Sequence, residues 1–110
     1  MLAGGCSSSG SEKSTGDSDD PLTGADLSIA SEEQAGEIGD RKVTADEYRA
    51  AFGRFRACLS TAGFELTDVA LEDGVYDFAL PDAAVQEGAD QECYRREYYF
   101  TDLLWQMSPR

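Results

Sequence analysis

One stretch, residues 43–63 (VTADEYRAAFGRFRACLSTAG), constrains the fold more than any other part of the chain. Its apolar side chains recur at the spacing of an α-helix and predict one continuous stripe made of Tyr48, Phe52, Phe55, Leu59 and Ala62. Thr44 and Glu47 have the spacing of a capping box, which begins a helix, and Gly63 suits the left-handed residue that ends one. The stretch therefore predicts an amphipathic helix, and this helix carries Cys58.

Downstream of this helix, residues 67–80 alternate apolar and polar side chains around Asp73-Gly74, a dipeptide favoured in two-residue hairpin turns. Pairing across that turn places Leu71 opposite Tyr76. The alternation predicts one apolar face made of Thr67, Val69, Leu71, Tyr76, Phe78 and Leu80. Two strands alone are only marginally stable, so we expect this face to pack on the stripe of the helix.

Residues 90–107 predict a second long helix with a broad apolar face. Its inward stripes are expected to hold Cys93, Tyr94, Tyr98, Phe100, Thr101, Leu104, Trp105 and Met107. Its outward residues are expected to be Arg95, Tyr99, Asp102 and Gln106. Residues 43–110 therefore predict a small single α+β domain in the order helix, β-hairpin, helix.

The segment before this domain, residues 7–42, is rich in Ser, Gly, Asp and Glu and carries 9 acidic and 3 basic residues. Few of its side chains are large and apolar, so burial offers little to offset the entropy of ordering the chain. We expect a disordered, flexible acidic linker, which its like charges keep extended.

The three cysteines divide into one terminal residue, Cys6, and an internal pair, Cys58 and Cys93. A disulfide between the internal pair would close a loop of 34 intervening residues. In an oxidising compartment it would stabilise a domain of this size by roughly 3–4 kcal/mol. Buried free thiols and metal ligands are the alternatives, although two cysteines without histidine do not make a zinc site.

The 110-residue chain has 22 acidic residues against 9 basic ones, a net charge of −13, and no histidine. A surface this acidic repels phosphate backbones, so we expect no nucleic-acid partner. The absence of histidine removes the Ser-His and Cys-His nucleophile pairs and the commonest general base. We therefore expect no catalytic residues, no cofactor and no metal site, and we expect that the protein is not an enzyme.

The first residues, Leu2-Ala3-Gly4-Gly5-Cys6, followed by a Ser/Gly run, resemble the lipobox of bacterial lipoproteins. In that family the cysteine thiol is lipidated and the signal peptide is cut just before it. The resemblance implies that residues 1–6 are a signal-peptide remnant with a lipobox, and that a lipid on Cys6 anchors the domain to the extracytoplasmic face of the membrane. The alternative is a short cytosolic N-terminus in which Cys6 is incidental.

The segments EYRAAFGRFRACL, DGVYDFALP and CYRREYYFTDLLW are spaced as in small lipoproteins of actinobacterial type, which they resemble. This resemblance implies export, a lipid anchor and an internal disulfide, but no activity. Among the clustered aromatic residues, Tyr99 falls on the polar side with Arg95, so we predict that these two contact a partner. We expect a membrane-tethered interaction or accessory module for an unknown protein or cell-wall ligand. The alternative is an accessory subunit that binds a peptide or glycan through exposed aromatic residues.

Overall fold

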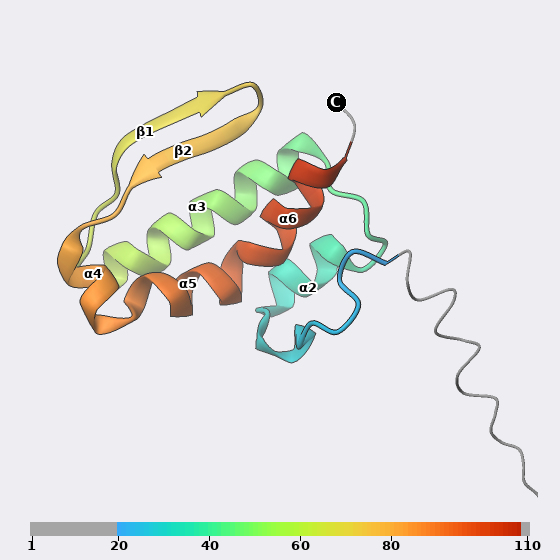
Figure 1. Cartoon of the computed structure of the whole chain (residues 1–110), viewed down its shortest axis with the longest axis horizontal. Helices are drawn as coiled ribbons and strands as arrows, with labels where there is room; N and C mark the ends of the chain where they lie inside the picture. Colours follow the sequence, from blue (N-terminus) through green and yellow to red (C-terminus); the bar gives the residue numbers. More distant parts are fainter. Residues whose placement is uncertain (1–19, 109–110) are drawn as a thin grey trace, which may run out of the picture.

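The computed structural model describes residues 20–108, which form an α+β domain, so the predicted fold class is confirmed (Figure 1). The elements in chain order are the 3₁₀ turn η2 (Leu27–Ile29), α2 (Glu32–Ile38), α3 (Ala45–Thr61), β1 (Thr67–Glu72), β2 (Val75–Ala79), α4 (Asp82–Glu87), α5 (Ala89–Glu97) and α6 (Tyr99–Met107). Cys6, the lipobox-like residues and the first part of the predicted linker lie outside the described residues.

The central helix, α3, has the ends that its sequence predicts. The N–H of Glu47 donates to Thr44 Oγ1 at 3.1 Å, and the N–H of Thr44 donates to Glu47 Oε1 at 2.9 Å, which completes the capping box. Gly63, with φ 97°, follows the end of the helix in the left-handed conformation. The predicted stripe is buried at Tyr48, Phe52, Phe55 and Leu59, whereas Ala62 is exposed because the helix ends at Thr61.

The hairpin lies along α3, with β2 nearer the helix and β1 at the outer edge (Figure 1). The ring of Tyr76 stacks on that of Phe52 with centroids 4.1 Å apart, and Phe78 packs on Phe55 at 5.5 Å. The predicted pairing of Leu71 with Tyr76 is confirmed. The prediction that Leu71 faces the core is wrong, because 57% of this residue is exposed.

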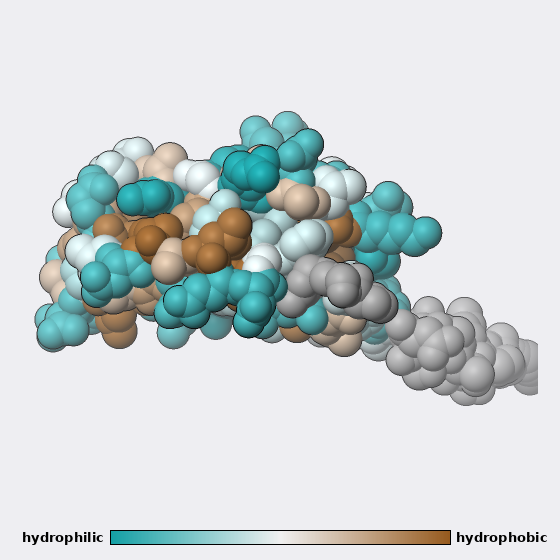
Figure 2. All heavy atoms as spheres, turned by 90° about the horizontal axis from the view of Figure 1, so that it is seen from above, coloured by the Kyte–Doolittle hydropathy of each residue, from teal (hydrophilic) through white to brown (hydrophobic). Residues whose placement is uncertain are grey.

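An irregularity in β1 explains why this strand contributes little to the core. Pairing with β2 is interrupted between Thr67 and Ala70, where Asp68 adopts a φ of 54°. An extra residue of this kind bends a strand and increases its twist. Thr67 is exposed as well, so β2 supplies most of the inward face. Seen from above, hydrophobic residues lie in the middle of the folded part and hydrophilic residues surround them (Figure 2).

Residues 20–42 belong to the folded domain, so the prediction that the flexible linker continues to residue 42 is wrong. Leu22 and Ile38 are only 3% and 2% exposed, and both lie in the core with the α3 stripe. The helix α2 begins after Ser31, whose Oγ accepts a hydrogen bond from the N–H of Gln34 at 3.1 Å. A helix of this length gains its stability from tertiary contacts, which the composition of the segment does not reveal.

The predicted helix over residues 90–107 is interrupted at Tyr98, whose φ of −136° and ψ of −33° separate α5 from α6. The break changes which face of α6 points inward. Asp102, expected on the outside, is 8% exposed, and Met107, expected on the inside, is 59% exposed. A single helical period across the whole segment therefore assigns both residues to the wrong side.

Gln34 of α2 supplies the hydrogen bonds that the break removes. Its Nε2 donates to the carbonyl oxygens of Arg95 and Arg96 at 2.9 and 2.6 Å. Its Oε1 accepts from the N–H groups of Phe100 and Thr101 at 2.8 and 3.1 Å. The Gln34 side chain is fully buried, so one residue of the segment predicted to be a linker holds α5 and α6 together.

A disulfide between Cys58 of α3 and Cys93 of α5 joins the central helix to the C-terminal part of the domain, with Cα atoms 5.7 Å apart. This pairing confirms the predicted disulfide. The bond lies one turn from Phe55 and one residue from Tyr94, so it fixes the distance between α3 and α5 next to these two rings.

Candidate functional site

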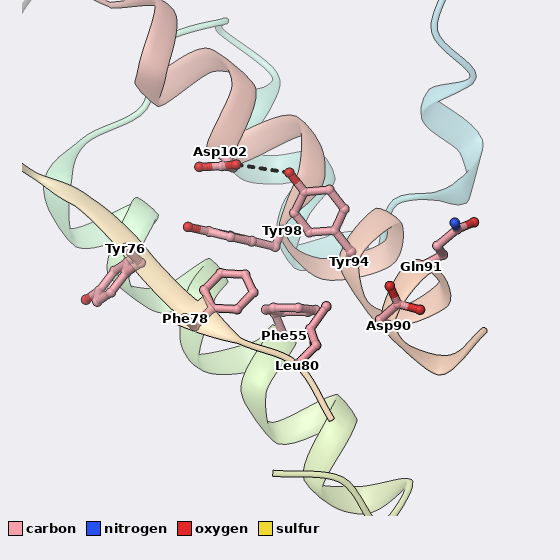
Figure 3. A pocket seen from close by; sticks show the side chains of 9 residues that line it. All are labelled: Phe55, Tyr76, Phe78, Leu80, Asp90, Gln91, Tyr94, Tyr98 and Asp102. Carbon is pink, nitrogen blue, oxygen red and sulfur yellow. Dashed lines mark hydrogen bonds between the residues drawn. The ribbon is translucent and has the colours of Figure 1, made fainter. Parts of the chain in front are cut away.

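A cavity of about 230 Å³ lies between β2, α3 and α5 (Figure 3). Its lining combines aromatic and aliphatic side chains with a few polar ones: Phe55, Tyr76, Phe78, Leu80, Asp90, Gln91, Tyr94, Tyr98 and Asp102. The residues come from four elements (α3, β2, α5 and α6), from the connection after β2 and from the break between α5 and α6. The cavity therefore exists only when the hairpin is packed against the helices.

The floor of the cavity consists of Phe55 and Tyr98, each 1% exposed, and half-buried Phe78, Leu80 and Tyr94 form its walls. The rings meet at steep angles: 58° between Phe55 and Phe78, 63° between Phe55 and Tyr94, and 69° between Tyr94 and Tyr98. Several ring faces and edges consequently surround the same space, as Figure 3 shows.

A hydrogen-bonded network of tyrosines and one carboxylate supports the inner side of the cavity. The hydroxyl of Tyr98 donates to that of Tyr48 at 2.7 Å, and Tyr48 donates to Asp102 Oδ1 at 3.1 Å. Tyr94 donates to Asp102 Oδ2 at 3.0 Å, and Gln106 Nε2 donates to Asp102 Oδ1 at 2.9 Å. Three donors thus satisfy the buried Asp102 carboxylate, which holds the rings of Tyr94 and Tyr98 in place.

The same network keeps the tyrosine hydroxyls protonated. Burial raises the pKa of Tyr98, and its hydrogen bond to Tyr48 and the charge of Asp102 raise it further. Burial and then the charge of Asp102 raise the pKa of Tyr94 in the same way. Both hydroxyls therefore remain neutral donors at physiological pH, and neither is available as a base.

Asp90, near the start of α5, differs from the other polar residues of the cavity. Its Oδ1 is buried and accepts no hydrogen bond, and it is the one buried side-chain oxygen or nitrogen of residues 20–108 in that condition. Buried polar atoms are otherwise paired in folded proteins, because an unpaired one costs about 1–3 kcal/mol. Asp90 thus lines the cavity with a carboxylate whose Oδ1, shielded from solvent, is unpaired within the domain.

The residues predicted to contact a partner, Tyr99 and Arg95, line a second, shallower hollow of about 480 Å³. Gln91 and Tyr94 line this hollow as well as the cavity, so the two depressions are neighbours. Tyr99 is 37% exposed, which agrees with its predicted place on the polar side. The structure brings Tyr99 and Arg95 together, but it places both outside the deeper apolar cavity.

The sequence did not identify Asp90, Gln91 or Asp102 as site residues. Asp90 and Gln91 are ordinary polar residues in the first turns of a predicted helix, and nothing in their spacing distinguishes them. Asp102 was assigned to the solvent face because the break at Tyr98 was not expected. The regular recurrence of Asp90, Tyr94 and Tyr98 was a usable signal, since residues four apart share a helix face.

Within the described part of the chain, no three His, Cys, Asp or Glu residues lie where they could hold a metal ion together. The same part of the chain contains no helix with the length and hydrophobicity needed to cross a membrane. Comparisons of the chain with protein-family models, with curated proteins and with solved structures find no match.

Proposed function

We propose that this domain is a binding module, which holds one compact group of its ligand in the cavity between the hairpin and α5. The observation that carries this proposal is the cavity itself, with aromatic walls and an unpaired polar atom at Asp90. Pockets that bind small groups typically combine apolar walls with a few converging polar atoms. The second hollow, with Tyr99 and Arg95, gives the remainder of the ligand a place to lie.

The size of the cavity restricts what it can hold. An apolar cavity of about 150 Å³ is large enough for benzene, so a cavity of about 230 Å³ suits one side chain or a similar compact group. A sugar ring needs several hydrogen-bond partners, whereas the hydroxyls of Tyr94 and Tyr98 are already bonded within the domain. The cavity therefore favours a compact group without hydroxyls over a glycan as its occupant.

A binding role also fits the state of the buried carboxylate better than a catalytic role. General acids and bases need an accessible atom within hydrogen-bond reach of the substrate. Asp102 has both oxygens engaged by tyrosine and glutamine donors, and the chain contains no histidine. We accordingly propose a protein that is not an enzyme, and whose partners do not include nucleic acid.

For the location of the module, we propose a lipid anchor on Cys6 that holds the domain at the extracytoplasmic face of the cell membrane. The support comes from the lipobox-like residues 2–6 and from the Cys58–Cys93 disulfide, since structural disulfides persist in oxidising compartments. The domain would then meet ligands or proteins in the cell envelope.

The cavity is tested by filling it. In Leu80→Trp the larger side chain occupies the space that Leu80 borders, and in the control Val85→Trp an exposed α4 residue changes without altering the cavity. Small organic probes, two neutral (benzyl alcohol and neohexyl alcohol) and one cationic (benzylamine), are titrated while NMR signals of Phe78 and Tyr94 are followed. We expect at least one probe to shift these signals in the wild type and in the control, and none to do so in Leu80→Trp. Identical behaviour of all three proteins contradicts the proposal.

The anchor is tested by an intact mass of protein expressed with its native upstream DNA and extracted from membranes. A mature chain that starts at a diacylated Cys6 is the expected result. An unprocessed chain found in the soluble fraction refutes the envelope location, but it leaves the binding function of the cavity untouched.

A further inference from the structure

We propose that the group bound in the cavity is a compact organic cation, an alkylammonium head, held between the aromatic rings and the carboxylate of Asp90. This inference rests on the proposed binding function and specifies the chemical class of its ligand. It follows from three features of the cavity: its aromatic walls, the carboxylate of Asp90 and the absence of a basic residue from its lining.

The aromatic walls favour a cation over a neutral group. Five of the lining residues are aromatic: Phe55, Tyr76, Phe78, Tyr94 and Tyr98. The face of each ring carries partial negative charge and attracts a cation, most strongly where water is excluded. Because Phe78 and Tyr94 each stand at a steep angle to Phe55, a rounded group can contact more than one ring at once. A trimethylammonium or similar head has this shape and this charge.

The unpaired oxygen of Asp90 favours a cation as well. A neutral apolar occupant would exclude water from the side of the cavity that Asp90 lines, and it would supply no charge to compensate this carboxylate. An anionic occupant would lie beside the carboxylates of Asp90 and Asp102, which both line the cavity. A cation offsets the first cost by Coulombic attraction and reverses the second, because its charge interacts favourably with both carboxylates. The net charge of −13 adds a long-range attraction for cations.

None of the described residues that line the cavity is basic. Arg95 lines the neighbouring hollow with Tyr99, and it is absent from the lining of the cavity. Arg54, the partly buried arginine of α3, is bonded to Glu37 and Glu97 at 2.8 and 2.9 Å. The negative groups at the cavity are therefore not neutralised by an ion pair with either arginine.

The test uses three probes of the same shape: choline, its neutral isostere neohexyl alcohol, and the tert-butylacetate anion. Dissociation constants are measured by NMR titration of the full chain and of the variant Asp90→Asn. The control is Asp77→Asn, which makes the same change of charge at an exposed residue of β2. Circular dichroism confirms that each variant is folded.

We expect choline to bind at least about tenfold more tightly than neohexyl alcohol, and tert-butylacetate to bind most weakly. Asp90→Asn should reduce the preference for choline by at least about fivefold, whereas Asp77→Asn should preserve it. A fourth probe, N-acetyl-lysinamide, distinguishes the two sources of such a cation. Tighter binding of choline assigns a free quaternary ammonium compound, tighter binding of N-acetyl-lysinamide assigns a protein side chain, and either order supports the inference.

The two proposals fail in different ways. If neohexyl alcohol binds as tightly as choline, or if Asp90→Asn leaves the preference unchanged, the cation inference is overturned and the binding function stands. If no probe shifts the signals of Phe78 and Tyr94, both the binding function and the cation inference are overturned.

Discussion

The most informative single substitution outside the cavity is Gln34→Met, because it removes the four hydrogen bonds that bridge α5 and α6 and keeps the length of the side chain. The N–H groups of Phe100 and Thr101 are buried, and each donates to Gln34 Oε1. A buried donor that loses its partner costs about 1–3 kcal/mol, so the two together should lower the free energy of unfolding by about 2–6 kcal/mol. Domains of this size are stable by about 5–15 kcal/mol, so this loss is a large fraction of the total.

The measurement is urea-induced unfolding, followed by circular dichroism, of the wild type, Gln34→Met and the control Gln86→Met. Gln86 is an exposed residue of α4, so its replacement should change the stability by no more than about 0.5 kcal/mol. If Gln34→Met is as stable as the control, Gln34 does not hold the two helices together and our description of the break is refuted. A loss confined to Gln34→Met supports it.

Three further predictions concern the disulfide, an exposed glycine of α3 and a buried tyrosine. Replacing Cys58 and Cys93 by serine removes a cross-link of sequence separation 35, so the free energy of unfolding should fall by about 3–4 kcal/mol. Urea-induced unfolding measures this loss, and equal stability of the oxidised wild type and the double variant contradicts the prediction. A Cβ at the exposed Gly53 meets no atom within 4 Å, so Gly53→Ala should stabilise α3 by about 1 kcal/mol, and an unchanged melting temperature argues against it. Burial raises the pKa of Tyr98, so above a pH of about 10 the unfolded chain loses this proton while the folded domain keeps it. The contribution of Tyr98 to the free energy of unfolding should therefore be constant below that pH and fall above it, by up to about 1.4 kcal/mol per pH unit. Tyr98→Phe should show a shallower fall in alkaline unfolding experiments than the exposed-site control Tyr99→Phe, and equal slopes count against the proposed burial effect.

The parts of the fold that the sequence predicted are those encoded by local patterns. The capping box at Thr44, the helical stripe through Phe52, the Asp-Gly turn and the Leu71–Tyr76 pair all depend on neighbouring residues, and all four are present in the structure. The disulfide followed from the composition and from the need of a small domain for a cross-link, and it is also present.

The parts that were not predicted depend on contacts between distant segments. The break at Tyr98 contains neither glycine nor proline, and Gln34, more than sixty residues earlier, stabilises it. Ser31-Glu32-Glu33-Gln34 has the sequence of a capping box, which is a local signal for the start of α2. The composition of the surrounding segment predicts flexibility and outweighs this signal. Once the break is missed, Asp102 is assigned to solvent and the inner side of the cavity cannot be recognised.

In the candidate site, too, the residues on one helix face could be predicted from the sequence, whereas those brought together from distant segments could not. Tyr99 and Arg95 were predicted from one helix face, and they do share a hollow. The deeper cavity needs Phe78 from the hairpin, Phe55 from α3 and Asp90 from α5 to meet, and no local pattern specifies that meeting. The unpaired oxygen of Asp90 is a property of packing alone, so only a structure can reveal it.

The binding function of the cavity is tested most directly by intermolecular nuclear Overhauser effects between a bound probe and the protein. The methyl protons of choline, or of neohexyl alcohol if it binds more tightly, are observed against the ring protons of Phe55, Phe78 and Tyr94. Binding in the cavity predicts contacts from one set of methyl protons to rings on both the hairpin and the helices. Contacts only to Tyr99, or no contacts at a probe concentration that saturates binding, would show that the ligand lies elsewhere and would contradict the central proposal.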